Sequence, residues 1–265
     1  NGSWICMAKD PKGRLLLGGQ NGQPITRVTL QEGRVIKQEI LSIPVSETMG
    51  MLFINDALYI SGAGSRGFAL YRCRDTKGND SYDNVEFLRE WRGGGGEHGS
   101  HGLVLGPDNM LYAVCGNFTG LPQDLTDTSP HRNYADDLAL PRMEDGNGFG
   151  AGAKPPGGYI ARMDLDGKNI ELFSSGQRNT YDIACNADGE LFGWDSDMSK
   201  FGPKAHVAAS SIDWNVYYGK RVAAVLENKW QTGSTWWGLK EGMIDLKHYN
   251  ATLPEDVKKL LEERR

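Results

Sequence analysis

Residues 103–114 read LVLGPDNMLYAV, two apolar β-prone runs joined by Gly-Pro-Asp-Asn, which is typical of a tight turn between antiparallel strands. The same unit returns at residues 4–17 (WICMAKDPKGRLLL), 51–60 (MLFINDALYI) and 181–192 (YDIACNADGELF). Hairpins that recur every few tens of residues, with few helix-length amphipathic windows between them, are typical of the four-stranded blades of a β-propeller. The sequence therefore predicts a mainly β first part built as a propeller.

This propeller is expected to be incomplete. The chain has 265 residues and 35 glycines, and the glycines concentrate between residues 12 and 193. At about 40 to 50 residues per blade, this part is long enough for only about four blades. The stretch 120–156 is predicted to be a long insertion, and closure of the ring would need more chain.

After Trp194 the pattern changes. Residues 216–230 (VYYGKRVAAVLENKW) place apolar side chains at helical intervals, and residues 254–265 (PEDVKKLLEERR) open with proline and two acids and end in two arginines. The second part is predicted to be a short α/β segment of the order β-α-β-α. We expect two domains, the incomplete propeller at 1–194 and the α/β segment at 195–265.

Composition excludes several classes of function. The net charge is −5 and the basic residues are scattered, so a nucleic-acid partner is not expected. No apolar run approaches the roughly 20 residues needed to cross a bilayer, so no transmembrane segment is predicted.

The four cysteines show no CxxC spacing and are interpreted as buried free thiols. No charged or apolar leader precedes Trp4, so the residues themselves do not indicate a location.

Two histidines stand in GGGGEHGSHG (93–102), which leads directly into the run quoted first. His98 and His101 are three residues apart, but glycines of this density do not hold a helix, and only Glu97 lies nearby as a further ligand; a metal site is therefore not predicted. A loop histidine can act as a general base because its ordinary pKa of about 6.5 lies near working pH. The alternative, a surface histidine without a role, stays open.

A second candidate is Arg178-Asn179 in SGQRNTYD (175–182). An arginine cation beside an amide can hold an anionic or carbonyl-rich ligand. The pair, expected at the start of a strand, could equally pin a loop between two strands.

Several of these motifs, in this order, resemble one family. The segments EHGSHGLVLGPDNMLYAVCGN (97–117), GGYIARMDLDGK (157–168) and SGQRNTYDIACNADGELF (175–192) are similar to the quinoprotein glucose/sorbosone dehydrogenase superfamily. The likeness is greatest to membrane-bound dehydrogenase propellers of Planctomycetes and Verrucomicrobia, and it covers residues 3–195.

This resemblance implies a cofactor and residue roles. Members are six-bladed propellers that bind pyrroloquinoline quinone (PQQ), often with Ca²⁺. By motif, His98 falls on the catalytic base that removes the hydroxyl proton of a sugar or alcohol while hydride passes to the quinone. Arg178 and Asn179 fall on the pair that contacts the quinone and polarises its reacting carbonyl, and His101 is a supporting neighbour at the cofactor.

The sequence also departs from that family. The glutamine that follows the Arg-Asn pair is Tyr181 here, and the Gln-Gly-Pro calcium segment of the glucose enzymes is replaced by Asp195-Ser196-Asp197. The basic residues that the closing blades supply have no counterpart in the chain. These departures weaken the expectation of activity more than the expectation of fold.

The second part resembles a different family. Its segments WDSDM (194–198), SSIDWNVYY (210–218), STWWGLKEGMIDL (234–246) and LPEDVKKLLEE (253–263) are similar to the C-terminal part of basic-membrane-protein family receptors. These are substrate-binding proteins of ABC transporters with a type I periplasmic-binding fold, several of which take purine nucleosides. The resemblance implies that Asp195 and Asp197 hold a pair of ribose hydroxyls.

Three functions follow as alternatives. The first is a PQQ-dependent sugar or alcohol dehydrogenase, inactive if its incomplete propeller cannot hold the quinone; the second is a periplasmic receptor for a purine nucleoside or sugar; the third is a propeller that only mediates interactions. Both families imply an extracytoplasmic, periplasmic location, and the electron acceptor or transporter partner stays unspecified. Because the two resemblances meet at GWDSDM (193–198), we interpret the sequence as joined or fragmentary, a chimera of two families; divergence of the propeller's own C-terminus is the alternative.

Overall fold

The computed structural model describes residues 4–19, 21–132, 142–144, 148–185, 191–193, 209–231, 237–238, 240–247 and 253–264. The chain divides into two compact units, Asn1–Ile183 and Ala184–Arg265. A domain boundary at residues 194/195 remains a prediction.

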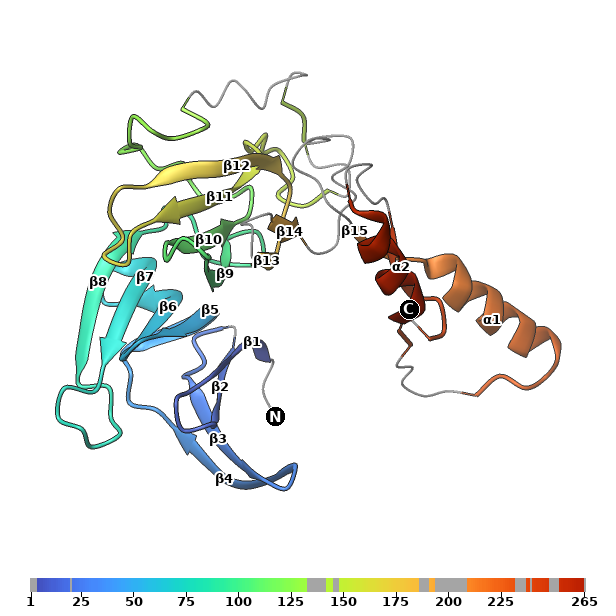
Figure 1. Cartoon of the computed structure of the whole chain (residues 1–265), viewed down its shortest axis with the longest axis horizontal. Helices are drawn as coiled ribbons and strands as arrows, with labels where there is room; N and C mark the ends of the chain where they lie inside the picture. The colour runs from blue at the N-terminus through green and yellow to red at the C-terminus, as the bar shows by residue number, and fades with distance from the viewer. Residues whose placement is uncertain are drawn as a thin grey trace. The chain divides into compact units, whose positions relative to one another are not determined.

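Three four-stranded antiparallel sheets build the first unit (Figure 1). The first holds β1 (Trp4–Lys9), β2 (Leu15–Gly19), β3 (Thr26–Gln31) and β4 (Arg34–Ile40). The second holds β5 (Val45–Ile54), β6 (Ala57–Gly64), β7 (Gly67–Arg74) and β8 (Asn84–Glu90). The third holds β9 (Ser100–Leu105), β10 (Leu111–Cys115), β11 (Gly158–Met163) and β12 (Glu171–Gln177).

In every sheet each strand pairs with the next one along the chain, which is the up-and-down order of a propeller blade. The first strands of the three sheets, β1, β5 and β9, lie next to one another. A two-stranded sheet follows, formed by β13 (Ile183–Cys185) and β14 (Leu191–Gly193). The prediction of a mainly β chain with an incomplete propeller is confirmed.

Aspartate turns set the hairpins at the places that the sequence predicts. Asp10 Oδ1 accepts hydrogen bonds from the backbone N–H groups of Lys12 (2.9 Å) and Arg14 (2.8 Å), which closes the turn between β1 and β2. Asp108 Oδ1 accepts one from the N–H of Met110 in the same way. These side-chain bonds stabilise the backbone of a turn, which explains why Asp10 and Asp108 lie where one strand ends and the next begins.

Neighbouring sheets pack face to face through two apolar clusters. Leu16 of the first sheet packs in one cluster with Leu58 of the second, and Leu70 of the second packs in another with Leu111 of the third. Leu70 and Tyr71 are consecutive in β7 and belong to different clusters, because successive side chains of a strand point to opposite faces. The second sheet therefore contributes to both clusters, and the first six residues of β6 are all buried.

Charged side chains join the first two sheets at the surface. Both carboxylate oxygens of Asp80, in the loop before β8, accept hydrogen bonds from the guanidinium of Arg14, in the turn before β2, at 2.5 and 2.7 Å. Lys12 Nζ (3.1 Å) and Arg27 Nη2 (3.3 Å) also contact this carboxylate. The hydrogen bonds from Arg14 hold the pKa of Asp80 well below its usual range, against the opposing effect of partial burial.

The contact between Asp80 and Arg14 is expected to stabilise the fold less at acid pH. Because the folded-state pKa of Asp80 is depressed, its stabilisation is fully present above the unfolded value of about 3.9 and is lost as the pH falls through the folded value. We expect Asp80→Asn to lower the urea midpoint at pH 7 and to flatten its decline between pH 5 and pH 2. Asp56→Asn, at an exposed carboxylate, is the control, and equal declines in both variants would contradict the prediction.

The second unit follows the predicted order β-α-β-α. After β14 it contains β15 (Ala209–Ile212), α1 (Trp214–Leu226), β16 (Ile244–Lys247) and α2 (Glu255–Arg264), and β15 and β16 pair antiparallel. The α1 helix begins two residues before the predicted Val216, because the side chain of Asp213 caps it by accepting from the N–H of Asn215. Among the described residues no helix is long and apolar enough to cross a membrane.

Candidate functional site

Two buried histidines form the centre of the candidate site. His98, which precedes β9, is 3% exposed, and His101, within β9, is 0% exposed. The expectation that both lie in a loop is therefore wrong for His101, and the alternative of surface histidines is wrong for both. His101 is drawn into the strand because Ser100–Leu105 pairs with β10, whose Cys115 lies opposite Ser100.

Each histidine has an asparagine partner. His98 Nδ1 lies 2.6 Å from Asn117 Oδ1, and His101 Nε2 lies 2.7 Å from Asn179 Oδ1. An amide oxygen only accepts hydrogen bonds, so in each pair the ring nitrogen that faces it carries the proton. When both rings are neutral, their tautomers are therefore opposite, Nδ1–H in His98 and Nε2–H in His101.

The tautomers give the two histidines different chemistry. In His98 the lone pair lies on Nε2, which forms no hydrogen bond among the described residues. In His101 the lone pair lies on Nδ1, which is buried and forms no hydrogen bond of ordinary geometry in the described part of the chain, although the nearby Glu97 backbone favours the protonated ring. Burial lowers the pKa of His101, with the Asn179 bond opposing it. His101 is thus held neutral, while His98 presents the ring nitrogen that can accept a proton.

Backbone contacts bring the distant segments of the site together. The N–H of Asn117 donates to the carbonyl of Arg178 (2.9 Å), and the N–H of Phe118 donates to the carbonyl of His98 (3.1 Å). A Cβ on Gly116 would lie 2.5 Å from the His98 carbonyl oxygen and 2.6 Å from Asn179 Oδ1, so the segments meet where only glycine fits. We call His98, His101, Asn117, Arg178 and Asn179 the histidine cluster.

The cluster joins residues that the sequence analysis proposed separately. Arg178 and Asn179 follow β12 and precede β13, so they lie in a connection and not at the start of a strand. Asn117 was missed, although it follows the predicted strand 110–114 closely. Phe149 was also missed; its ring stacks on that of His98, with centroids 3.7 Å apart and planes at 12°. No signal in the sequence marks Phe149 as a neighbour of His98.

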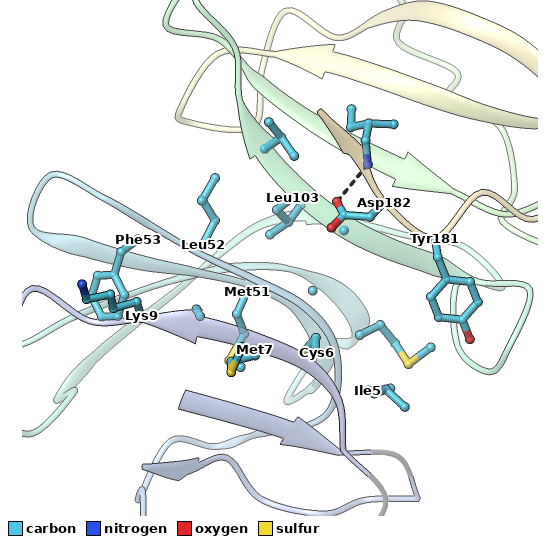
Figure 2. A pocket seen from close by; sticks show the side chains of 16 residues that line it. Ile5, Cys6, Met7, Lys9, Met51, Leu52, Phe53, Leu103, Tyr181 and Asp182 are labelled. Carbon is cyan, nitrogen blue, oxygen red and sulfur yellow. Dashed lines mark hydrogen bonds between the residues drawn. The ribbon is translucent and has the colours of Figure 1, made fainter. Parts of the chain in front are cut away.

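Tyr181 connects the cluster to a cavity. Its ring stacks on that of His101 at 4.0 Å, at the position where the resembling family has glutamine. The cavity, of about 550 Å³, lies along the inner strands β1, β5 and β9, and Figure 2 shows Asp182 and Leu103 at one side of it and Cys6, Met7 and Met51 at the other. Asp182 Oδ1 accepts from the N–H of Ile183 (2.9 Å), and burial raises the pKa of Asp182.

Thiols and metal ligands are not gathered at this site. All four cysteines are free, and burial raises the pKa of Cys6, Cys73 and Cys115 to about 12, which keeps these three as thiols near neutral pH. The described residues include no group of three or more His, Cys, Asp or Glu side chains placed to hold a metal ion. Asp195 and Asp197, the candidate ribose ligands, lie outside the described residues.

The second unit matches a known family. Residues 184–265 match the model of the PnrA-like ABC transporter substrate-binding proteins. A purine-binding protein of Brucella abortus (strain 2308) is 43% identical over 74 residues, which are 28% of this chain and 21% of that protein. The predicted resemblance to basic-membrane-protein receptors is confirmed, and the chain spans about a fifth of the relative that it matches.

The solved structures similar to the chain include sugar dehydrogenases, a putative gluconolactonase and virginiamycin B lyase from Staphylococcus aureus. The PQQ-bound aldose sugar dehydrogenase of Streptomyces coelicolor is 20% identical with a TM-score of 0.48, and the alignment covers 74% of this chain and 58% of that one. The PQQ domain of pyranose dehydrogenase from Coprinopsis cinerea is 13% identical with a TM-score of 0.46, covering 72% and 43%. At these identities and scores the matches say nothing about the reaction of this chain.

Proposed function

We propose that the first unit belongs to a quinone-dependent sugar or alcohol dehydrogenase, with His98 as the general base. The observation that carries the proposal is the bond from His98 Nδ1 to Asn117 Oδ1, since it leaves the lone pair on Nε2. A hydroxyl proton of the substrate would move to this Nε2. Asn117 would then stabilise the imidazolium by accepting from its Nδ1–H.

The donor set of the histidine cluster fits a planar, carbonyl-rich anion such as PQQ. Because Asn179 Oδ1 is bound to His101, the N–H groups that remain on Asn179 are donors, and donors are what a quinone carbonyl binds. Arg178, next in the chain, would supply a fixed cation for the carboxylates. When bound, the quinone accepts the hydride that leaves the substrate carbon. Ca²⁺ remains an expectation from the resemblance, without a ligand group in the described residues.

Quinone binding and dye reduction test this proposal. Purified chain is titrated with PQQ by calorimetry, with and without Ca²⁺, and then assayed for dye reduction with a panel of aldoses and primary alcohols. We expect binding that Arg178→Ala weakens, and substrate-dependent reduction. The weakest affinity sought is a Kd of about 100 µM, which corresponds to about −5.5 kcal/mol. If 100 µM PQQ gives no heat of binding and no dye is reduced, the proposal is overturned.

A second function is favoured by the family match of residues 184–265. We propose that this unit derives from a nucleoside receptor, with Asp195 and Asp197 accepting hydrogen bonds from ribose hydroxyls, and that the protein is extracytoplasmic. A thermal-shift series with adenosine, guanosine, 2′-deoxyadenosine and 3′-deoxyadenosine tests it. A rise in melting temperature with the ribonucleosides, absent with both deoxy analogues, would support hydrogen bonds to the vicinal hydroxyls. No change in melting temperature at millimolar adenosine would count against the proposal.

A further inference from the structure

Two aromatic rings pack against the imidazole of His98 and against each other. Phe149 lies flat on the imidazole at 3.7 Å, and Phe118 meets it edge-on, with centroids 5.7 Å apart and planes at 76°. The two phenylalanines also contact each other edge-on, at 5.4 Å and 82°. The imidazole is therefore fixed by one hydrogen bond in its plane and by aromatic contacts on a face and at an edge.

Local backbone geometry places Phe149 on the histidine. It stands between Gly148 and Gly150, whose φ angles of +77° and +61° lie in the left-handed region that favours glycine. A Cβ on Gly150 would lie 2.4 Å from Phe118 Cζ, so a side chain there would push Phe118 away. Phe149 is half-buried and lies in the connection 116–157 between β10 and β11. The turn at its two glycines places its ring against the imidazole.

We propose that Phe149 is a positioning residue, which fixes the plane of the His98 imidazole so that Nδ1 stays bonded to Asn117 and Nε2 stays available. A hydrogen bond weakens steeply when the ring tilts out of line with its acceptor. The flat contact with Phe149 opposes this tilt. This inference rests on the proposed role of His98 as a base, and it adds a residue that the resemblance does not provide.

The tautomer of His98 gives a readout that needs neither cofactor nor substrate. With ¹⁵N-histidine labelling, the Nδ1–H and Nε2–H forms have distinct nitrogen shifts, and His98→Gln assigns its signals among the five histidines of the chain. We expect a single Nδ1–H form in the wild type and in Phe149→Tyr, which keeps the ring. Phe149→Ala and Phe149→Leu, which keeps only apolar volume, are expected to give averaged signals of both forms.

Two controls separate positioning from general loosening. The signals of His101, stacked on Tyr181, should not move in any Phe149 variant. Phe173→Ala, which removes a ring packed edge-on against Tyr112 in the same sheet, should leave His98 unchanged. An Nδ1–H form in Phe149→Ala and Phe149→Leu identical to that of the wild type would overturn the proposal, as would a shift of His101 equal to that of His98.

Kinetics distinguish this inference from the proposed function. In active protein, Phe149→Leu should lower kcat by about 10-fold with little change in KM, and Phe149→Tyr should restore it, because a misplaced base costs rate more than binding. If the Phe149 variants change the tautomer of His98 but the protein has no dehydrogenase activity, the positioning role is supported and the proposed function is wrong. If the protein is active but the variants leave the tautomer unchanged, the proposed function is supported and the role of Phe149 is wrong.

Discussion

Replacing His98 with glutamine is expected to lower the kcat of PQQ-dependent dye reduction by about 10²- to 10⁴-fold, the usual contribution of a positioned general base. Glutamine has an amide where the imidazole has a basic nitrogen, so it can occupy much of the space between Phe149 and Asn117 without accepting a proton at neutral pH. The substrate hydroxyl would then have to lose its proton to water. The measurement is initial rate against substrate concentration in quinone-saturated protein.

His131→Gln is the matched control for this variant. His131 contributes its backbone carbonyl to the Ser129 hydroxyl and has no part in the histidine cluster, so its replacement should leave kcat unchanged. Circular dichroism melts of both variants check that the fold is kept. A His98→Gln variant that is folded, binds quinone and retains kcat within a factor of about two would remove His98 from the reaction, since two-fold corresponds to well under 1 kcal/mol.

Gly50→Ala is expected to cause a large loss of stability. A Cβ on Gly50, in β5, would lie 2.1 Å from the carbonyl oxygen of His101 and 3.0 Å from its carbonyl carbon, in β9 of the next sheet. Both atoms belong to backbone and cannot rotate away, so the two inner strands would have to separate. We expect a loss of about 3 kcal/mol or more, at the upper end of overpacking effects.

Urea unfolding followed by the β-sheet circular dichroism band measures this loss. Gly95→Ala is the matched control, because its Cβ would meet only the ring of Phe68 at an ordinary 3.4 Å, and a change within about 1 kcal/mol is expected there. Gly50→Ala should also disturb the His101 signals, since it pushes on the His101 carbonyl. Equal midpoints for Gly50→Ala and the wild type would show that β5 and β9 are not in contact as described.

The repeating hairpins could be predicted because they depend on local chemistry. Asp10 and Asp108 accept backbone hydrogen bonds from residues two to four positions away, so a short sequence is sufficient to mark each turn. The helices after residue 213 were predicted for the same reason: apolar spacing and terminal charges are local signals. The beginning of α1 shifted by two residues because the Asp213 cap is set by its own side-chain geometry.

The candidate site could be predicted only in part. His98, His101, Arg178 and Asn179 stand in motifs and were proposed from the sequence, but their pairing depends on contacts across 78 residues, as between His101 and Asn179. Asn117 and Phe149 reach His98 from 19 and 51 residues further along the chain. Neither carries a local pattern that distinguishes it from a turn asparagine or a loop phenylalanine.

By itself, then, the sequence determined the strand and turn order, the change of class after the propeller part, and the residue types available for proton transfer, because each depends on neighbours within a few positions. Only the tertiary structure decided which histidine keeps its proton on Nδ1 and its lone pair on Nε2. That choice depends on which ring nitrogen meets an amide oxygen, and the sheets bring the amides to the histidines: Asn117 after β10, and Asn179 after β12. Because burial removes competing water, these two contacts fix opposite tautomers on residues only three positions apart.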